Sequence, residues 1–177
     1  MKGPMLAGLL MTSLAFSSPM LPRSAPELNI NEPDGKTSML SSYKGKVVVL
    51  EFLFVKSQHC LRVAKMLNQL QQELGSRGLQ SIGIAFDAPN ADATGGEYLG
   101  VMADALQLAY PVGYSHKTSV DAFLGRTGND TLAIPQIVVI DRAGVIRAAS
   151  GGQTNPTLED ISALRILLEP LLKEQRT

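Results

Sequence analysis

The 177-residue sequence has few of the residues on which several common functions depend. It contains no tryptophan and a single cysteine, Cys60; aromatic residues make up only 5% of it, and its formal net charge is zero. One cysteine excludes a disulfide within the chain. Balanced charges provide no basic surface for phosphate groups, so we expect no nucleic-acid partner. Any redox chemistry of this chain therefore depends on Cys60.

The length and the apolar content of the sequence are sufficient for one domain. Apolar residues account for 45% of the chain, and 177 residues can bury one substantial core. We find no internal repeat and no low-complexity segment. The acidic residues and histidines do not follow the spacing of a metal site, and the glycines do not follow that of a dinucleotide site, so we predict no cofactor.

The N-terminus, residues 1–25, has the order of a secretory signal peptide. Lys2 precedes the apolar stretch 4–16, and small and turn-forming residues follow it. Cleavage is expected near Ser18 or Ala25. The stretch is shorter than the about 20 residues of a transmembrane helix, although an uncleaved membrane anchor and an N-terminus without a targeting role are alternatives. The prediction is a periplasmic or secreted protein.

The hydrophobic pattern predicts a strand, a helix and a second strand. Residues 47–54 are mostly β-branched or aromatic, which is typical of a strand covered on both faces. Ser57 is a good N-cap, and apolar residues then recur at helical spacing until Gly75. Residues 79–86 form the next buried strand. A helical crossover of this kind places the two strands parallel in one sheet.

The rest of the chain predicts shorter elements that alternate between strand and helix. In order, they are a hairpin of residues 27–30 and 37–40, a loop over 87–96, a helix over 98–108, a strand over 110–114, a helix over 118–124, a hairpin of 136–141 and 145–149, and a closing helix from about residue 155 with a kinked or frayed end at Pro170. This alternation predicts an α/β fold.

Several separate segments, in this order, resemble the thioredoxin superfamily. They are Asp34-Gly35-Lys36, residues 43–50, Ser57-Gln58-His59-Cys60, Ala133-Ile134-Pro135 and residues 139–144. Within the superfamily the chain is similar to the redoxin branch, which contains the alkyl hydroperoxide reductase/thiol-specific antioxidant proteins and the TlpA-like thiol-disulfide oxidoreductases. The resemblance implies a thioredoxin-like domain over residues 26–177, a three-layer sandwich with a central mixed β-sheet and helices on both faces.

The site motif departs from both branches of the family. In the oxidoreductases the helix opens with Cys-x-x-Cys, but Ser57 stands at the first position, and a hydroxyl cannot form a disulfide. In the peroxidases the motif is Thr or Ser, two residues and the reactive cysteine, which makes Cys60 the nucleophile. The family's proline is replaced by Leu53, and its arginine near Ile134 is absent. The cations left for that role are Lys56, Arg62 and Arg126.

The candidate catalytic residues are Cys60, Ser57 and His59. Cys60 lies in the first turn of the predicted helix, where the helix dipole favours a thiolate, whereas burial favours the thiol. His59 either donates a proton near the sulfur or faces solvent. The resemblance implies that Pro135 is cis and lies against the cysteine, so that Ile134 and Pro135 form a peptide-facing wall; an ordinary trans proline is the alternative.

Two functions of different classes remain open. The first is a thiol-dependent redox protein of the antioxidant type, which reduces a peroxide or a protein disulfide through Cys60 and needs an external thiol or thioredoxin-like reductant. The second is a non-catalytic thioredoxin-like binding module that has lost the redox pair. A homodimer linked through Cys60 is a further hypothesis about partners.

Overall fold

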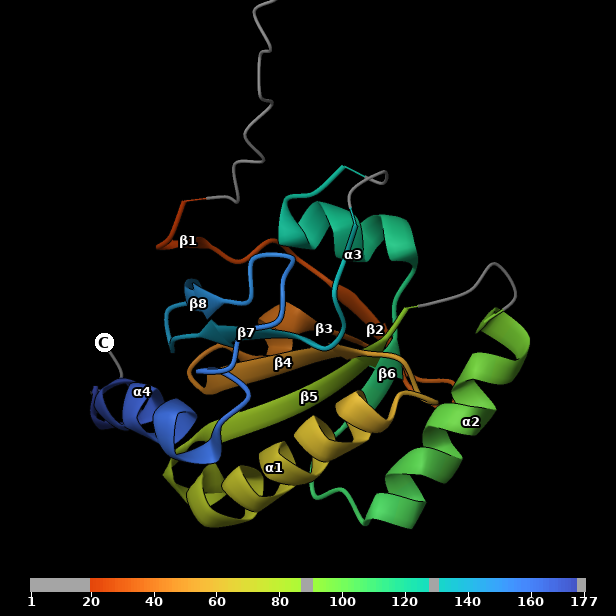
Figure 1. Cartoon of the computed structure of the whole chain (residues 1–177), viewed down its shortest axis with the longest axis horizontal. Helices are drawn as coiled ribbons and strands as arrows, with labels where there is room; N and C mark the ends of the chain where they lie inside the picture. The colour runs from red at the N-terminus through yellow and green to blue at the C-terminus, as the bar shows by residue number, and fades with distance from the viewer. Residues whose placement is uncertain (1–19, 87–90, 128–130, 175–177) are drawn as a thin grey trace, which may run out of the picture.

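The structure is a computed structural model that describes residues 20–86, 91–127 and 131–174 (Figure 1). Its strands are β1 (Arg23–Ser24), β2 (Asn29–Asn31), β3 (Thr37–Met39), β4 (Val47–Leu53), β5 (Leu79–Ala85), β6 (Val112–Tyr114), β7 (Gln136–Ile140) and β8 (Val145–Ala149). Its helices are η1 (Leu40–Tyr43), α1 (Gln58–Leu74), η2 (Gly75–Arg77), α2 (Ala91–Leu106), α3 (Lys117–Leu124) and α4 (Ile161–Lys173). The α/β prediction is confirmed.

One mixed sheet joins all of these strands, in the order β1-β8-β7-β4-β5-β6-β2-β3. β4 pairs in parallel with β5 over its full length, and β5 pairs in parallel with β6. On its other side β4 pairs antiparallel with β7, which forms a hairpin with β8. The predicted strand–helix–strand unit and both predicted hairpins are confirmed. β4 is therefore an interior strand with neighbours on both sides.

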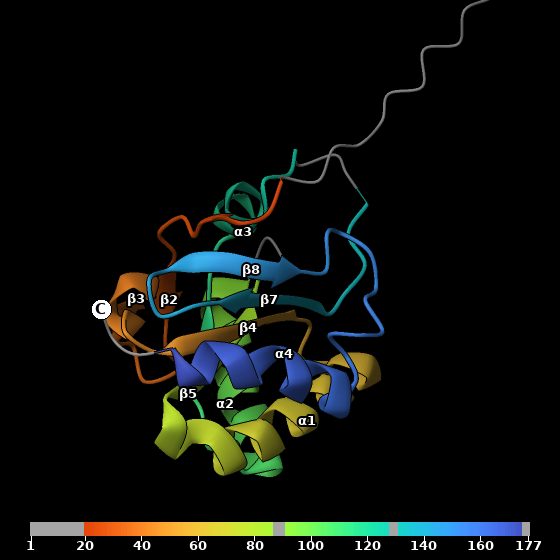
Figure 2. The same ribbon diagram turned by 90° about the vertical axis from the view of Figure 1, so that its left-hand side faces the viewer.

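The two faces of the sheet bury two apolar clusters. Because side chains alternate along a strand, β4 contributes Val47, Val49 and Leu53 to one cluster and Val48, Leu50 and Phe52 to the other. Helices α1, α2 and α4 cover the first face, and α3 covers the second. Figure 2 shows α1 and α4 together on one side of the sheet and α3 apart from them on the other. We call the first the α1 face.

Helix α1 begins and ends where the sequence predicts. Ser57 is its N-cap, and the Ser57 hydroxyl accepts a hydrogen bond from the Cys60 N–H at 3.3 Å. Its buried residues follow helical spacing: Cys60, Val63, Ala64, Leu67, Leu70 and Leu74. After the short helix η2, Gly78 takes up a left-handed φ of 101° and leads into β5. The apolar stripe of α1 thus sets Cys60 at its N-terminal end against the α1 face.

Two predicted boundaries are wrong. Helix α2 begins at Ala91, inside the predicted loop, and packs Leu99 on the sheet despite the polar composition that precedes it. Helix α4 begins only at Ile161, with Asp160 as its N-cap, rather than near Asn155. The Asn155 side chain accepts hydrogen bonds from nearby backbone N–H groups and forms a separate turn, because asparagine competes in this way with helix formation. Pro170 lies within α4.

Strand β1 lies inside the segment that we assign to the leader. Arg23 and Ser24 pair with β8 at one edge of the sheet. Residues 1–19 lie outside the described part of the chain, so the signal peptide stays a prediction. Among the helices that the structure describes, none is both long enough and apolar enough to cross a membrane.

Gly113 in β6 has no room for a side chain. A Cβ at this position would overlap Cγ2 of Ile30 and lie 3.1 Å from the Asn31 carbonyl oxygen. We expect Gly113→Ala to lower the free energy of unfolding by about 1–3 kcal/mol through overpacking. The control is Gly100→Ala in α2, whose Cβ would lie 3.5 Å from Pro33 and which gains helix propensity. Urea unfolding followed by circular dichroism measures both, and equal losses would contradict the assignment.

Candidate functional site

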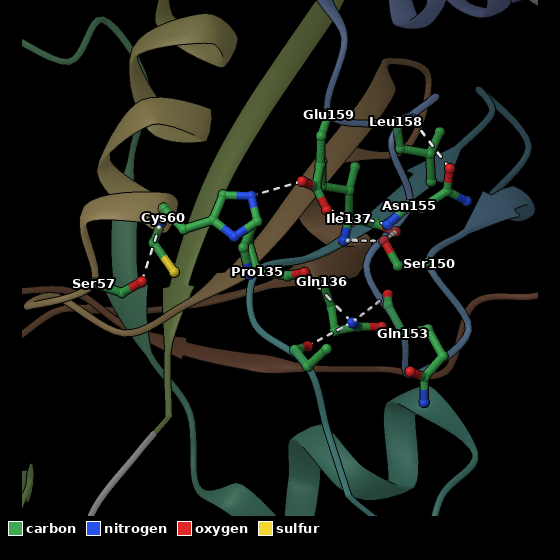
Figure 3. A network of polar contacts seen from close by, with 12 residues as sticks. Ser57, Cys60, Pro135, Gln136, Ile137, Ser150, Gln153, Asn155, Leu158 and Glu159 are labelled. Atoms are coloured by element: carbon green, nitrogen blue, oxygen red, sulfur yellow. Dashed lines mark hydrogen bonds and ion pairs between the residues drawn. The ribbon is translucent and has the colours of Figure 1, made fainter.

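Cys60 is fully buried at the start of α1 (Figure 3). Its sulfur accepts a hydrogen bond from the Phe54 N–H at 3.5 Å, at the end of the strand that α1 follows. Burial raises the pKa of the Cys60 thiol, and the hydrogen bonds of Ser57 and Phe54 oppose this effect without reversing it. Of the two opposing effects that the sequence leaves open, burial is thus the stronger. In the folded protein at neutral pH the group is a thiol.

Glu51 is a carboxylic acid in the core that the sequence patterns do not single out. Glu51 lies in the middle of β4 with none of its surface exposed, and neither carboxylate oxygen has a hydrogen-bond partner among the described residues. Strand alternation puts it on the α1 face, between Val49 and Leu53. Gly83 stands beside it on β5 and carries no side chain to crowd the carboxyl group. Cys60 packs against the same face.

Glu51 is electrostatically coupled to the groups around it. Burial raises the pKa of its carboxyl group well above the ordinary value of 4.5, and the charge of Glu159 raises it further. The charge of Glu51 in turn adds to the raised pKa of the Cys60 thiol and of the Tyr110 phenol, whose hydroxyl donates to the Ala64 carbonyl. The sequence held one signal: Glu51 is the single ionisable residue in an apolar run of eight, residues 47–54.

His59 pairs with an acid that lies 100 residues away in sequence. Its Nε2 is 2.7 Å from Oε2 of Glu159, and the two side chains are 35% and 12% exposed. The other carboxylate oxygen of Glu159 accepts the Asn155 N–H at 3.1 Å. Of the two predicted alternatives for His59, neither describes this contact fully, because the ring faces the turn that precedes α4. His59 therefore ties the first turn of α1 to residues 155–159.

Pro135 is cis, as predicted, and is buried near Cys60 in the site drawn in Figure 3. Gln136, which follows it, holds this segment in place. The Gln136 amide donates to the carbonyls of Ala133 at 2.6 Å and Gln153 at 3.0 Å, and its oxygen accepts the Gly152 N–H at 2.8 Å. Ile134 is partly buried against both apolar clusters. The structure thus brings Ile134 and Pro135 to the same end of the sheet as Cys60.

The three candidate cations are engaged elsewhere or exposed. The ammonium group of Lys56 lies 5.1 Å from the ring centre of Tyr98. Arg126 pairs with Asp121 of α3, the helix that covers the opposite face of the sheet from Cys60. Arg62 is exposed on α1. Within the part of the chain that the structure describes, the donor to the Cys60 sulfur is the Phe54 N–H and not a guanidinium group.

A protein-family model that matches most of the chain identifies the family. A family model described as the AhpC/TSA family matches residues 22–149, which include β1 to β8, Cys60 and the cis proline. The chain belongs to the AhpC/TSA family. The redoxin resemblance and the thioredoxin-like fold are thereby confirmed, and membership of this family associates the chain with thiol and disulfide chemistry. No curated protein matches the chain.

The solved structures that superpose on this chain include thiol:disulfide interchange proteins and a peroxidoxin. A thiol:disulfide interchange protein of the thioredoxin family from Chlorobium tepidum superposes with a TM-score of 0.68 at 22% identity, covering 88% of this chain and 99% of the other. A thiol:disulfide interchange protein from Bacteroides sp. gives 0.62 at 18% identity, covering 88% and 91%. Peroxidoxin BcpB from Mycobacterium tuberculosis gives 0.65 at 17% identity, covering 84% and 96%. These identities show the fold alone.

The raised pKa of Glu51 predicts a pH dependence of stability. In the unfolded chain this carboxyl ionises above about pH 4.5, whereas in the folded protein it keeps its proton to higher pH. The folded state then binds more protons, so the free energy of unfolding falls as pH rises above 4.5, with a slope of at most about 1.4 kcal/mol per pH unit. Glu51→Gln removes this contribution. Urea unfolding at pH 5, 6, 7 and 8 measures it, and parallel profiles for the two proteins would contradict the burial of an ionisable Glu51.

Proposed function

We propose that the protein exchanges disulfides through Cys60 alone and that Glu51 carries the proton of the thiol. The observation that supports this proposal is the buried pair itself: a thiol and a carboxyl group on the same face of the sheet, coupled electrostatically and shielded from water. A buried carboxyl group whose hydrogen bonds to water are not replaced destabilises the folded state by about 1–3 kcal/mol, and by more when it is ionised. A perturbed acid beside a thiol is a typical functional arrangement.

The proton balance of the reaction requires such a group. The thiolate is the nucleophile in disulfide exchange, but burial keeps Cys60 as a thiol. In the proposed step the ionised fraction of Glu51 accepts the Cys60 proton while the sulfur attacks a disulfide R–S–S–R′. A bond forms between Cys60 and one sulfur, the S–S bond breaks, and the proton passes to the leaving sulfur as R′–SH. An acid with a raised pKa is suited to both transfers.

An external thiol must complete the cycle. Ser57 stands at the first position of the family's Cys-x-x-Cys pair, so the chain has no other cysteine that could resolve a mixed disulfide at Cys60. A small thiol or a thioredoxin-like reductant therefore attacks the Cys60–S–S–R bond, releases a new disulfide and returns Cys60 to the thiol form. Ile134 and Pro135 form the wall beside which an extended segment of a protein disulfide binds. Export by the predicted leader would bring the chain to a compartment where disulfides persist.

Disulfide exchange is better supported than peroxide reduction. Peroxide reduction needs a thiolate stabilised by a fixed positive charge, and Arg126 pairs with Asp121 of α3, the helix that covers the other face of the sheet. Lys56 is directed over Tyr98. The homodimer stays a prediction, and the burial of Cys60 weighs against it because two buried sulfurs cannot meet without an opening of both copies.

A second candidate function is the non-catalytic binding module. The complete burial of the Cys60 sulfur and the serine at the N-cap favour it, because a closed site with one thiol can serve purely as packing. In this function the Ile134–Pro135 wall would bind an extended segment without any covalent step. The two functions differ in whether the native thiol reacts at all.

Cys60 should form a mixed disulfide in the native protein. We expect folded protein incubated with oxidised glutathione at pH 7.5 to gain one glutathione adduct, which an external thiol removes. Glu51→Gln should slow adduct formation about tenfold, because the nearby proton acceptor is lost. Intact mass spectrometry of acid-quenched samples measures both. Cys60→Ser is the control without an adduct, and modification that occurs only in denaturant would favour the binding module.

Ser57→Cys should restore an intramolecular redox pair. The N-cap and Cys60 are already joined by a hydrogen bond across the first turn, the spacing at which Cys-x-x-Cys forms a disulfide. We expect the variant to lose its free thiols on mild oxidation and to reduce insulin disulfides with dithiothreitol at least tenfold faster than the wild type. The same variant with Cys60→Ala should show neither property. If the variant still has both free thiols after the oxidation step, the first turn cannot adopt this geometry.

A further inference from the structure

The contact between His59 and Glu159 joins the first turn of α1, which carries the buried Cys60, to the turn that precedes α4. His59 is the residue before Cys60, and Glu159 fixes its ring through Nε2 at 2.7 Å. Glu159 is itself held, because its second oxygen accepts the Asn155 N–H and its neighbour Leu158 is buried in the cluster of the α1 face. Glu159 is therefore held in place, and its contact with His59 connects the first turn of α1 to a fixed point.

The remainder of α1 is attached more firmly than its first turn. Val63, Leu67 and Leu70 are buried on the α1 face, so any opening there exposes apolar surface. The first turn has fewer attachments besides Cys60. They include the backbone bond from the Leu61 N–H to the Ser57 carbonyl at 3.0 Å, the backbone bond from the Ser57 N–H to the Phe54 carbonyl at 3.0 Å, the Ser57 cap and the hydrogen bond of His59. A movement of this turn therefore exposes less apolar surface than an opening along the rest of the helix, and it separates His59 from Glu159.

We propose that the hydrogen bond between His59 and Glu159 is a latch that controls access to Cys60, with Glu159 as a positioning residue that acts through His59. With the latch closed the sulfur has no exposed surface, so a reagent reaches it only after the first turn moves. The proposal goes beyond disulfide exchange, because the latch limits access for any electrophile that reacts with the thiol.

The chain offers a matched control at the other end of the same helix. Glu73 of α1 pairs with Arg165 of α4 at 2.6 Å, so it also links α1 to the C-terminal part of the chain. This pair lies at the last turn of α1, about four turns from Cys60. Loss of either contact removes one side-chain interaction between α1 and the C-terminal part of the chain. The pair at residue 59, and not the one at residue 73, should change access to the thiol.

Alkylation of the native full-length protein by iodoacetamide at fixed pH, followed by intact mass, tests the proposal. We expect Glu159→Gln and His59→Ala each to raise the Cys60 alkylation rate about tenfold, equivalent to about 1.4 kcal/mol of opening free energy. The double variant should react no faster than either single variant, because both remove one interaction. Glu73→Gln should react as the wild type does.

Low concentrations of urea distinguish local opening from unfolding. Opening of one turn exposes little surface, so the alkylation rate should hardly change with urea, whereas reaction through global unfolding rises steeply. The latch is refuted by wild-type rates in both variants, by an equal increase in Glu73→Gln, or by a steep urea dependence that matches the loss of global stability. Faster alkylation without a glutathione adduct would retain the latch and reject disulfide exchange, so the two proposals fail separately.

Discussion

β4 is covered on both faces, and this removes every side chain that it carries from water. All seven of its residues are buried, six in apolar contacts and one, Glu51, as an acid. The strand lies between β5 and β7, so it also fixes the direction in which the chain enters α1. The burial of Glu51, the position of Cys60 and the raised pKa of both groups follow from this one placement.

The first residue of the family's oxidoreductase motif has two roles, as the start of the helix and as a sulfur for disulfide exchange. Ser57 fills the first role, since its hydroxyl accepts a hydrogen bond from a backbone N–H of the first turn. It cannot fill the second role, because a hydroxyl oxygen does not take part in disulfide exchange. The helix therefore starts in the family's position with one sulfur, and the folded site depends on groups from outside the helix: Glu51 from β4, Glu159 from the turn before α4, and Pro135.

The sequence predicts the strong elements because their signals are local. The apolar run of β4, the helical spacing in α1 and the N-cap at Ser57 each depend on a few adjacent residues, and the structure has all three. Asn155-Pro156-Thr157 was misleading because the same residues favour a helix start and an isolated turn. The contact between His59 and Glu159 spans 100 residues, and no local pattern predicts it. The burial of Glu51 could not be predicted in this way, because one acid in an otherwise apolar run does not change the prediction of a buried strand.

The short strands at the two edges of the sheet affect whether the sheets of two molecules can pair with each other. β1 has two residues and β3 has three, and these are the outermost strands of the described sheet. A long open edge would offer unpaired backbone groups to a strand of another molecule. Here each edge offers a few such groups at most, while the long β4 and β5 are enclosed. The topology thus limits growth of the sheet from one molecule to the next.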